Sequence, residues 1–124
     1  MAKIMVVDDS GLSRRVSRKI LEDAGHSVVD AQDGMTALEN YFLDRPDVVL
    51  LDVTMKGMNG IEVLGRLREL DHDARVIIVT ADVQSSTRAM TTDGGACGFV
   101  TKPIVSDRIL NAVDAALRGV TPCN

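Results

Sequence analysis

The chain has 124 residues, a length that supports one compact domain. Apolar residues make up 45% of it and charged residues 26%, which is typical of soluble globular proteins and excludes a disordered or fibrous chain. The net charge of −4 argues against binding nucleic acid by neutralising its phosphates. The longest aliphatic runs, such as Val48 to Leu51, fall far short of the roughly 20 apolar residues that span a membrane, so we expect a cytoplasmic protein without a membrane segment.

Aromatic residues make up only 2% of the chain, too few for stacking on nucleic-acid bases or for enclosing a flavin. Cys97 and Cys123 match no metal-binding or redox spacing, and in a reducing compartment we expect both to be thiols. The function is therefore expected to depend on polar side chains.

Five short apolar runs, rich in β-branched residues, alternate with longer segments of helical period. The runs predict strands at residues 4–7, 28–29, 48–51, 76–79 and 99–100. Because each run is apolar on both faces, it is typical of a parallel strand covered by helices on both sides. The pattern predicts an α/β fold in which a strand and a helix alternate five times, giving a five-stranded parallel sheet that is doubly wound.

The first helix is expected over about residues 11–24, with Gly25 as its stop. The second begins after a capping Asp33 and ends before Pro46, whose ring disfavours helix continuation. Apolar residues at helical spacing define the faces of these two helices: Leu12, Val16, Ile20 and Ala24 in the first, and Met35, Leu38, Tyr41 and Phe42 in the second.

The third helix is expected after a capping Asn59, with Glu62 placed to pair with Arg66 one turn later. The last helix is expected after a capping Ser106 and before Gly119. Inward positions are Ile61, Leu64 and Leu67 in the third helix, and Ile109, Val113, Ala116 and Leu117 in the last.

The fourth helical segment, around residues 83–93, has the weakest helical pattern. Its serines and threonines compete for backbone hydrogen bonds, and two glycines follow it. We therefore expect this segment to be loosely held.

Polar side chains follow four of the predicted strands. Asp8 and Asp9 follow the first strand, Asp52 the third, Thr80 ends the fourth, and Lys102 follows the fifth. The carboxyl ends of parallel strands meet at one edge of a sheet, so we expect these residues to converge. Two unit charges ~4 Å apart repel by about 4 kcal/mol at an effective dielectric near 20, so the carboxylates need positive charge. Lys102 supplies one charge, and Mg²⁺ suits the remaining oxygen ligands.

Three carboxylates, a hydroxyl and an ammonium are the groups needed to move a phosphoryl group onto an aspartate. Asp52 is the predicted nucleophile, because it stands alone at the end of the central strand. Taken singly, Asp8-Asp9-Ser10 reads as a helix cap, Thr80 as a strand residue and Lys102-Pro103 as a loop. Those separate interpretations do not account for all of them falling on one edge of the sheet.

This pattern resembles the receiver domain of two-component response regulators, of the chemotaxis-regulator type. The likeness covers the chain from Lys3 to Gly119, and it implies one receiver domain over residues 1–124 with the flavodoxin-like strand order 2-1-3-4-5. The matching residues are Asp8-Asp9, Asp52-Val53-Thr54-Met55, Gly57, Gly60, Thr80-Ala81, Phe99 and Thr101-Lys102-Pro103.

The resemblance implies that Asp52 accepts a phosphoryl group from a histidine kinase or a phosphotransfer protein. It implies that Asp9, Asp52 and the backbone carbonyl of Thr54 hold Mg²⁺, with Asp8 acting mainly through water. Lys102 would pair with the acceptor and then with the phosphoryl group, and the Lys102-Pro103 peptide bond would be cis.

The resemblance further implies a conformational switch. Thr80 would move to bond a phosphoryl oxygen, and Phe99 would turn inward into the space that Thr80 leaves. The surface of the fourth helix, fifth strand and fifth helix would then change and control a downstream target protein or output domain. We expect no binding of nucleic acid by the domain itself and no enzyme activity in the turnover sense.

The sequence departs from the family at the acceptor loop, where Lys56 stands in place of a common proline, and Thr54 and Asp82 occupy its variable positions. The resemblance implies that these positions influence the rate or the lifetime of phosphorylation. The basic residues of the first helix form either a solvated face or, as the family implies, a docking stripe for kinases and phosphatases: Arg14, Arg15, Arg18 and Lys19.

Three other functions fit parts of the pattern. A phosphatase of the haloacid-dehalogenase type also uses an aspartate nucleophile with Mg²⁺, but it wants a second aspartate where Thr54 stands. A flavodoxin-like flavin binder needs a phosphate-binding loop after the first strand, where Asp8-Asp9 would repel phosphate. A receiver-like interaction module that takes no phosphate is disfavoured by the complete acceptor set.

Overall fold

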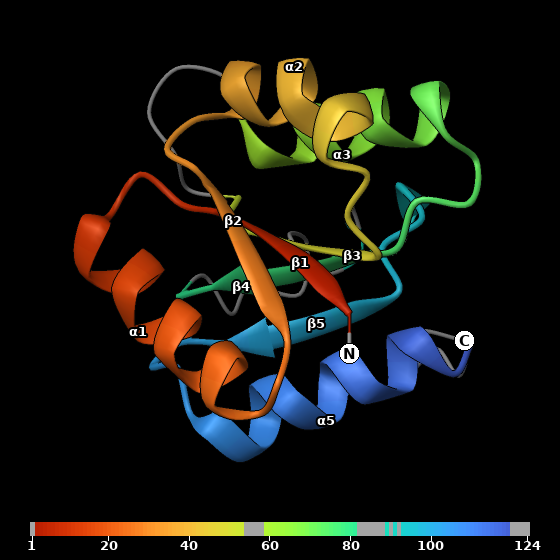
Figure 1. Cartoon of the computed structure of the whole chain (residues 1–124). Helices are drawn as coiled ribbons and strands as arrows, with labels where there is room; N and C mark the ends of the chain where they lie inside the picture. The colour runs from red at the N-terminus through yellow and green to blue at the C-terminus, as the bar shows by residue number, and fades with distance from the viewer. Residues whose placement is uncertain (1, 54–58, 82–88, 90, 92, 120–124) are drawn as a thin grey trace.

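The computed structural model describes residues 2–53, 59–81, 89, 91 and 93–119. Its five strands form one parallel sheet in the order β2-β1-β3-β4-β5, which confirms the predicted strands, fold class and strand order (Figure 1). The strands are β1 (Lys3–Val7), β2 (Ser27–Ala31), β3 (Val48–Leu51), β4 (Val76–Thr80) and β5 (Gly98–Thr101).

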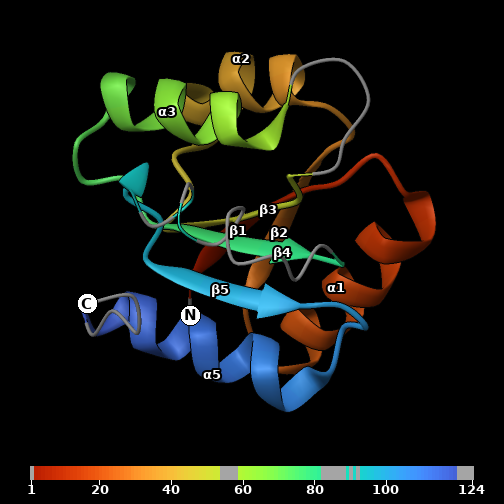
Figure 2. The same ribbon diagram turned by 180° about the vertical axis from the view of Figure 1, so that it is seen from behind.

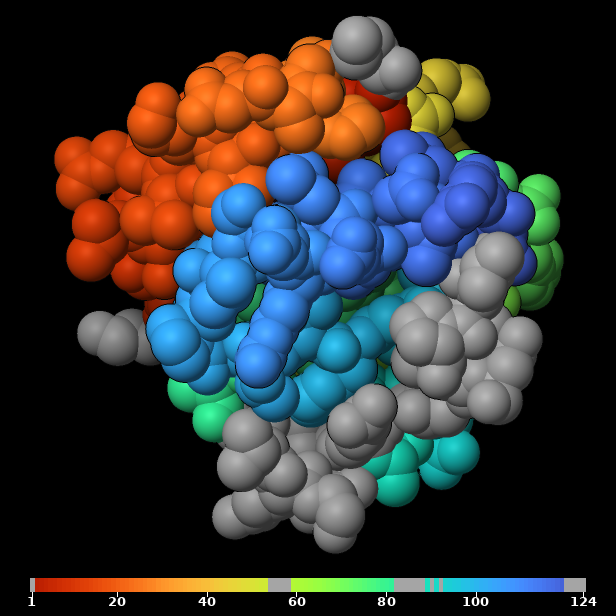
Figure 3. Space-filling model, turned by 90° about the horizontal axis from the view of Figure 1, so that it is seen from below, coloured from red at the N-terminus to blue at the C-terminus, as the bar shows by residue number. Residues whose placement is uncertain are grey.

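Helices cover both faces of the sheet, as Figures 1 and 2 show. On one face lie α1 (Gly11–Asp23) and α5 (Ser106–Leu117), side by side in Figure 3. On the other face lie α2 (Gly34–Asp44) and α3 (Gly60–Leu70). Each face has its own apolar core, and all residues of β3 and β4 are buried. In the part of the chain that the structure describes, none of the helices has the length and apolar character needed to cross a membrane.

Most of the predicted helix ends are confirmed. The Asp33 carboxylate accepts a hydrogen bond from the Thr36 amide at 2.7 Å, and Asn59 caps α3 in the same way. Gly25 and Gly119 follow α1 and α5 in the left-handed region, with φ of 95° and 75°. The Lys102-Pro103 peptide bond is cis, as the resemblance implied.

The predicted cap at Ser106 is wrong. Ser106 is the first residue of α5, and Val105 occupies the capping position without a side-chain hydrogen bond. The Val105 carbonyl accepts the Ile109 amide at 3.1 Å, so the helix begins one residue earlier than the serine indicated. Inside the helix, Ser106 is no longer placed to cap it.

The predicted apolar face of α1 is confirmed in part. Ile20 is half-buried and packs against the core, but Leu12 is 65% exposed and Val16 38%, whereas Ser17 and Leu21 are buried against the sheet. A stripe with strict four-residue spacing drifts around a helix of 3.6 residues per turn, and its first two members face outward here.

The apolar face of α2 is confirmed in part. Tyr41 is 5% exposed and Leu38 is half-buried, but Met35 and Phe42 are 55% and 45% exposed. Small residues, Gly34 and Ala37, face the sheet with Tyr41.

The predicted inward faces of α3 and α5 are confirmed. Leu64, Leu67, Ile109, Val113 and Ala116 are buried, and Ile61 and Leu117 are half-buried. The exposed pair of Glu62 and Arg66 is present at 3.2 Å. Most of the fourth predicted helix, residues 83–93, lies outside the described residues, although Thr91 within it is buried.

Gly60 brings the start of α3 against the end of β3. A Cβ atom at this position would lie 2.3 Å from Val53 Cα and 2.5 Å from the Asp52 carbonyl oxygen. The Gly60 amide donates to the Val53 carbonyl at 3.3 Å. The helix can approach the backbone of Asp52 this closely only because residue 60 has no side chain.

We predict that Gly60→Ala lowers the free energy of unfolding by about 1–3 kcal/mol, because the backbone atoms it meets cannot yield like a flexible side chain. Gly65→Ala in the same helix is the matched control, since nothing lies within 4 Å of its Cβ position. Gly65→Ala is expected to raise the free energy of unfolding by up to about 1 kcal/mol, because alanine has a higher helix propensity than glycine. Urea unfolding followed by circular dichroism measures both, and equal effects would contradict this account of Gly60.

Tyr41 links α2 to the turn after α3. Its hydroxyl donates to Asp71 Oδ2 at 2.8 Å. Burial and this bond raise the pKa of Tyr41, and the same bond holds the pKa of Asp71 below its ordinary 3.8. The bond therefore favours the carboxylate form of Asp71 in the folded protein.

We predict that Tyr41→Phe lowers the free energy of unfolding at pH 7 by about 1 kcal/mol. The stability that comes from the lowered pKa of Asp71 is present above its unfolded value, near pH 4, and is lost as pH falls through its folded value. The difference between wild type and variant should therefore shrink below pH 4. Urea unfolding at pH 7 and pH 3 tests this, and an equal difference at both would contradict it.

Candidate functional site

The two buried carboxylates of the site come from neighbouring strands. Val7 of β1 pairs with Leu51 of β3, so the residues that follow, Asp8 and Asp52, lie side by side. The Asp52 amide donates to the Val7 carbonyl at 3.0 Å, which fixes the start of the acceptor loop. Both aspartates are 4% exposed.

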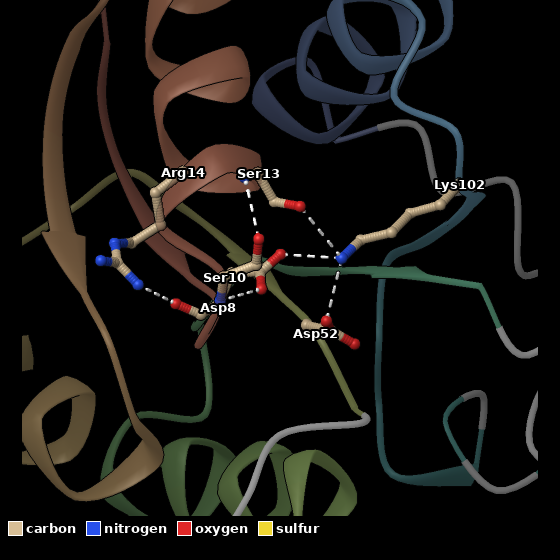
Figure 4. A network of polar contacts seen from close by, with 6 residues as sticks. All are labelled: Asp8, Ser10, Ser13, Arg14, Asp52 and Lys102. Atoms are coloured by element: carbon tan, nitrogen blue, oxygen red, sulfur yellow. Dashed lines mark hydrogen bonds and ion pairs between the residues drawn. The ribbon is translucent and has the colours of Figure 1, made fainter.

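Lys102 reaches these carboxylates from the end of β5, the outermost strand on one side of the sheet. Its amide donates to the Thr80 carbonyl at 2.8 Å, which ties the residue after β5 to the end of β4. Its Nζ lies 2.9 Å from Asp8 Oδ2 and 3.0 Å from Asp52 Oδ2 (Figure 4). A longer contact of 3.5 Å joins Nζ to Ser13 Oγ on α1.

The ammonium of Lys102 is stabilised by its two acidic neighbours. Burial acts to lower the pKa of Lys102, but the hydrogen bonds and charges of Asp8 and Asp52 outweigh it and raise that pKa above its ordinary value. The side chain is 19% exposed, so water screens these interactions only in part. Lys102 is therefore positively charged at neutral pH.

A third carboxylate completes the cluster. Asp9 is exposed, and carboxylate oxygens of Asp8, Asp9 and Asp52 all lie within 4.8 Å of one another. Asp8 is held from both sides, since its Oδ1 accepts the Ser10 amide at 2.9 Å while Oδ2 bonds Lys102. Among the described residues, Lys102 contacts two of these three carboxylates, and hard oxygen donors at this spacing fit a divalent cation such as Mg²⁺.

The structure brings Asp8, Asp9, Asp52 and Lys102 together as predicted from their places after the strands. Thr80 ends β4 beside them and is fully buried. Phe99 lies in β5 opposite Ile78 and is half-buried against the core under α2 and α3. Other residues singled out in the acceptor loop and after β4 lie outside the described residues: Thr54, Lys56 and Asp82.

Two residues of the first turn of α1 were not expected at the site. Ser13 contacts Lys102, and an Arg14 guanidinium nitrogen donates to the Asp8 carbonyl. In the sequence, only their position indicates this placement. They lie three and four residues after the capping Ser10, where a helix side chain can turn back toward the preceding strand.

The basic residues of α1 do not form one stripe. Arg18 pairs with Glu22 and Asp30, and Lys19 pairs with Asp23. Arg14 faces the site, and Arg15 is exposed. Arg14, Arg18 and Lys19 therefore each contact different neighbours.

Comparison with known proteins identifies the family of this chain. Residues 4–114 match the family model described as the response regulator receiver domain. The chain is 36% identical to the chemotaxis protein CheY of Bacillus subtilis, covering 93% of this chain and 97% of that protein. It is 39% identical to the response regulator MprA of Mycolicibacterium vanbaalenii over 97% of its own length, and spans about half of that longer relative, 52%.

Solved structures agree with this assignment. A two-component response regulator of the LuxR family from Aurantimonas sp. superposes with a TM-score of 0.92 and 34% identity, covering 98% of this chain and 88% of that one. Chemotaxis protein CheY4 of Vibrio cholerae gives a TM-score of 0.90 and 30% identity, covering 94% and 99%. The sheet order, the acidic edge with its lysine and these likenesses lead to one conclusion: the chain belongs to the response regulator receiver domain family.

Proposed function

We propose that the protein is a phosphorylation-dependent signalling switch that accepts a phosphoryl group on Asp52 from a histidine kinase or a phosphotransfer protein. The observation that carries this proposal is the Asp52 carboxylate, which is 4% exposed, bonded to the Lys102 ammonium at 3.0 Å and next to two further carboxylates. An ordinary structural ion pair between Lys102 and Asp52 would not require the two additional carboxylates. They are the groups expected where a cation is bound beside an attacking carboxylate.

In the proposed transfer, a carboxylate oxygen of Asp52 attacks phosphorus. A bond forms between this oxygen and phosphorus while the bond from phosphorus to the donor imidazole nitrogen breaks, and that nitrogen keeps the electron pair. Lys102 then neutralises charge on the transferred oxygens.

Asp8, Asp9 and Asp52 would hold Mg²⁺, together with the carbonyl of Thr54 if the resemblance holds there. When bound, the ion supplies positive charge for the oxygens of the transferred group. The protein is not an enzyme in the turnover sense under this proposal, because one chain takes up one phosphoryl group.

The effect of phosphorylation would reach β5 through two contacts of Thr80. Thr80 is the Cα partner of Thr101 in the β4–β5 pairing, and its carbonyl holds the Lys102 amide. A new acceptor oxygen near Thr80 would therefore act on the same strand that carries Phe99. We propose that the altered surface of β5 and the helices beside it controls a downstream target protein or output domain.

The phosphodonor is proposed to dock beside α1. Lys102, which contacts the nearly buried Asp52, also borders a hollow at the surface beside α1. Leu12, which is 65% exposed, lies on this border together with Val16 of the same helix. The hollow there has a volume of about 300 Å³ and is lined by Leu12, Ser13, Val16, Lys102, Pro103 and Ile104.

We predict that acetyl phosphate with Mg²⁺ adds one phosphoryl group to the wild-type chain and none to Asp52→Asn, as measured by intact mass. Asp73→Asn is the matched control, since Asp73 is exposed in the turn before β4 and should leave labelling unchanged. Labelling that persists in Asp52→Asn, or that needs no Mg²⁺, would contradict the proposal. Repeated turnover of a phosphomonoester would favour the phosphatase instead.

We predict that Lys102→Met lowers the free energy of unfolding by roughly 3 kcal/mol in the absence of divalent cations, because two buried carboxylates lose their counter-charge. Millimolar Mg²⁺ should restore more stability to this variant than it adds to wild type. Lys19→Met, which breaks an exposed pair with Asp23, is the control and should cost less than about 1 kcal/mol. Thermal unfolding with and without Mg²⁺ measures this, and an unchanged Lys102→Met variant would disprove it.

A further inference from the structure

Arg14 contacts the acidic site from the side opposite Lys102. It lies in the first turn of α1, where its own amide donates to the Ser10 carbonyl at 3.0 Å. Its half-buried side chain turns back toward the end of β1, and Nη1 donates to the Asp8 carbonyl oxygen at 2.5 Å. Figure 4 shows Arg14 and Lys102 on the two sides of Asp8, one at the main-chain carbonyl and the other at the carboxylate.

The bond to the Asp8 carbonyl acts on the peptide unit that joins Asp8 to Asp9. A peptide unit is planar, so fixing the direction of its oxygen also fixes its nitrogen and the Cα atom of Asp9. The Asp8 amide donates to the Ala31 carbonyl of β2 at 3.1 Å, which joins this segment to the sheet. Beyond it the chain leaves the sheet, and Asp9 lies on the exposed side of the cluster.

We propose that Arg14 is a positioning residue, which holds the Asp8–Asp9 peptide so that the Asp9 carboxylate faces Asp8 and Asp52. This inference rests on the proposed Mg²⁺ site and adds to it a residue that does not touch the ion. Groups that orient the ligands of a metal typically change its affinity 10- to 100-fold when removed.

The charge of Arg14 and its proposed positioning role predict opposite changes in Mg²⁺ affinity when Arg14 is removed. The direction of the measured change therefore distinguishes between them. A guanidinium repels a divalent cation, so removing it would tighten Mg²⁺ binding if Arg14 acted through its field alone. Removing a positioning group weakens binding instead. If Arg14 only anchored the start of α1, its loss would lower stability and leave Mg²⁺ affinity unchanged.

The test compares three variants of the full chain by titration calorimetry with MgCl₂. Arg14→Met should raise the Kd for Mg²⁺ about tenfold. Arg14→Lys keeps a cation that can donate to one carbonyl and should recover part of the affinity. Arg15→Met removes the same charge from the next, exposed residue and should keep Kd within about twofold of wild type, toward tighter binding.

Tighter binding in Arg14→Met, matching Arg15→Met, would overturn the positioning role in favour of a field effect. An unchanged Kd with lowered stability in urea would overturn it in favour of a structural anchor. If Arg14→Met does not fold, Arg14→Lys decides the question, with several-fold weaker binding expected. Failure of wild type to take up Mg²⁺ would overturn the metal site of the proposed function as well, so the two failures are distinguishable.

Discussion

The site depends on one interaction, the ammonium of Lys102 between the carboxylates of Asp8 and Asp52. Lys102 follows β5, Asp8 follows β1 and Asp52 follows β3. The contact therefore spans four of the five strands at the carboxyl end of the sheet. The parallel order places β1 beside β3, which brings the acids together, and leaves β4 between them and the lysine. The long side chain of Lys102, whose backbone is anchored at the end of β4 through the Thr80 carbonyl, crosses that distance and is half-buried.

This arrangement places charge where a small domain is least able to tolerate it. Two carboxylates that are 4% exposed share the Lys102 ammonium and a third carboxylate lies nearby, although burying charged groups is unfavourable. A structure selected for stability alone would use apolar residues here. The concentration of charge couples the stability of the domain to the chemistry at the carboxyl end of its sheet.

Much of the fold and site could be predicted, for reasons that also show where prediction stops. Apolar runs identify buried parallel strands, and Asp8, Asp9, Asp52 and Lys102 could be placed together because strand ends share an edge. The rotation of α1 could not be predicted, since Leu12 faces outward and a serine faces the core. Nor could the role of Arg14, because a basic residue in a first helical turn usually lies in solvent and only the folded backbone shows that it turns inward.

The close approach of Gly60 to the backbone of Asp52 and Val53 gives the acceptor a stiff support on one side. Main-chain atoms in direct contact leave no room for compression, whereas side chains can change rotamer. A rearrangement around Asp52 therefore has little room on the side of α3, and one absent side chain at residue 60 sets how closely that helix encloses the end of β3.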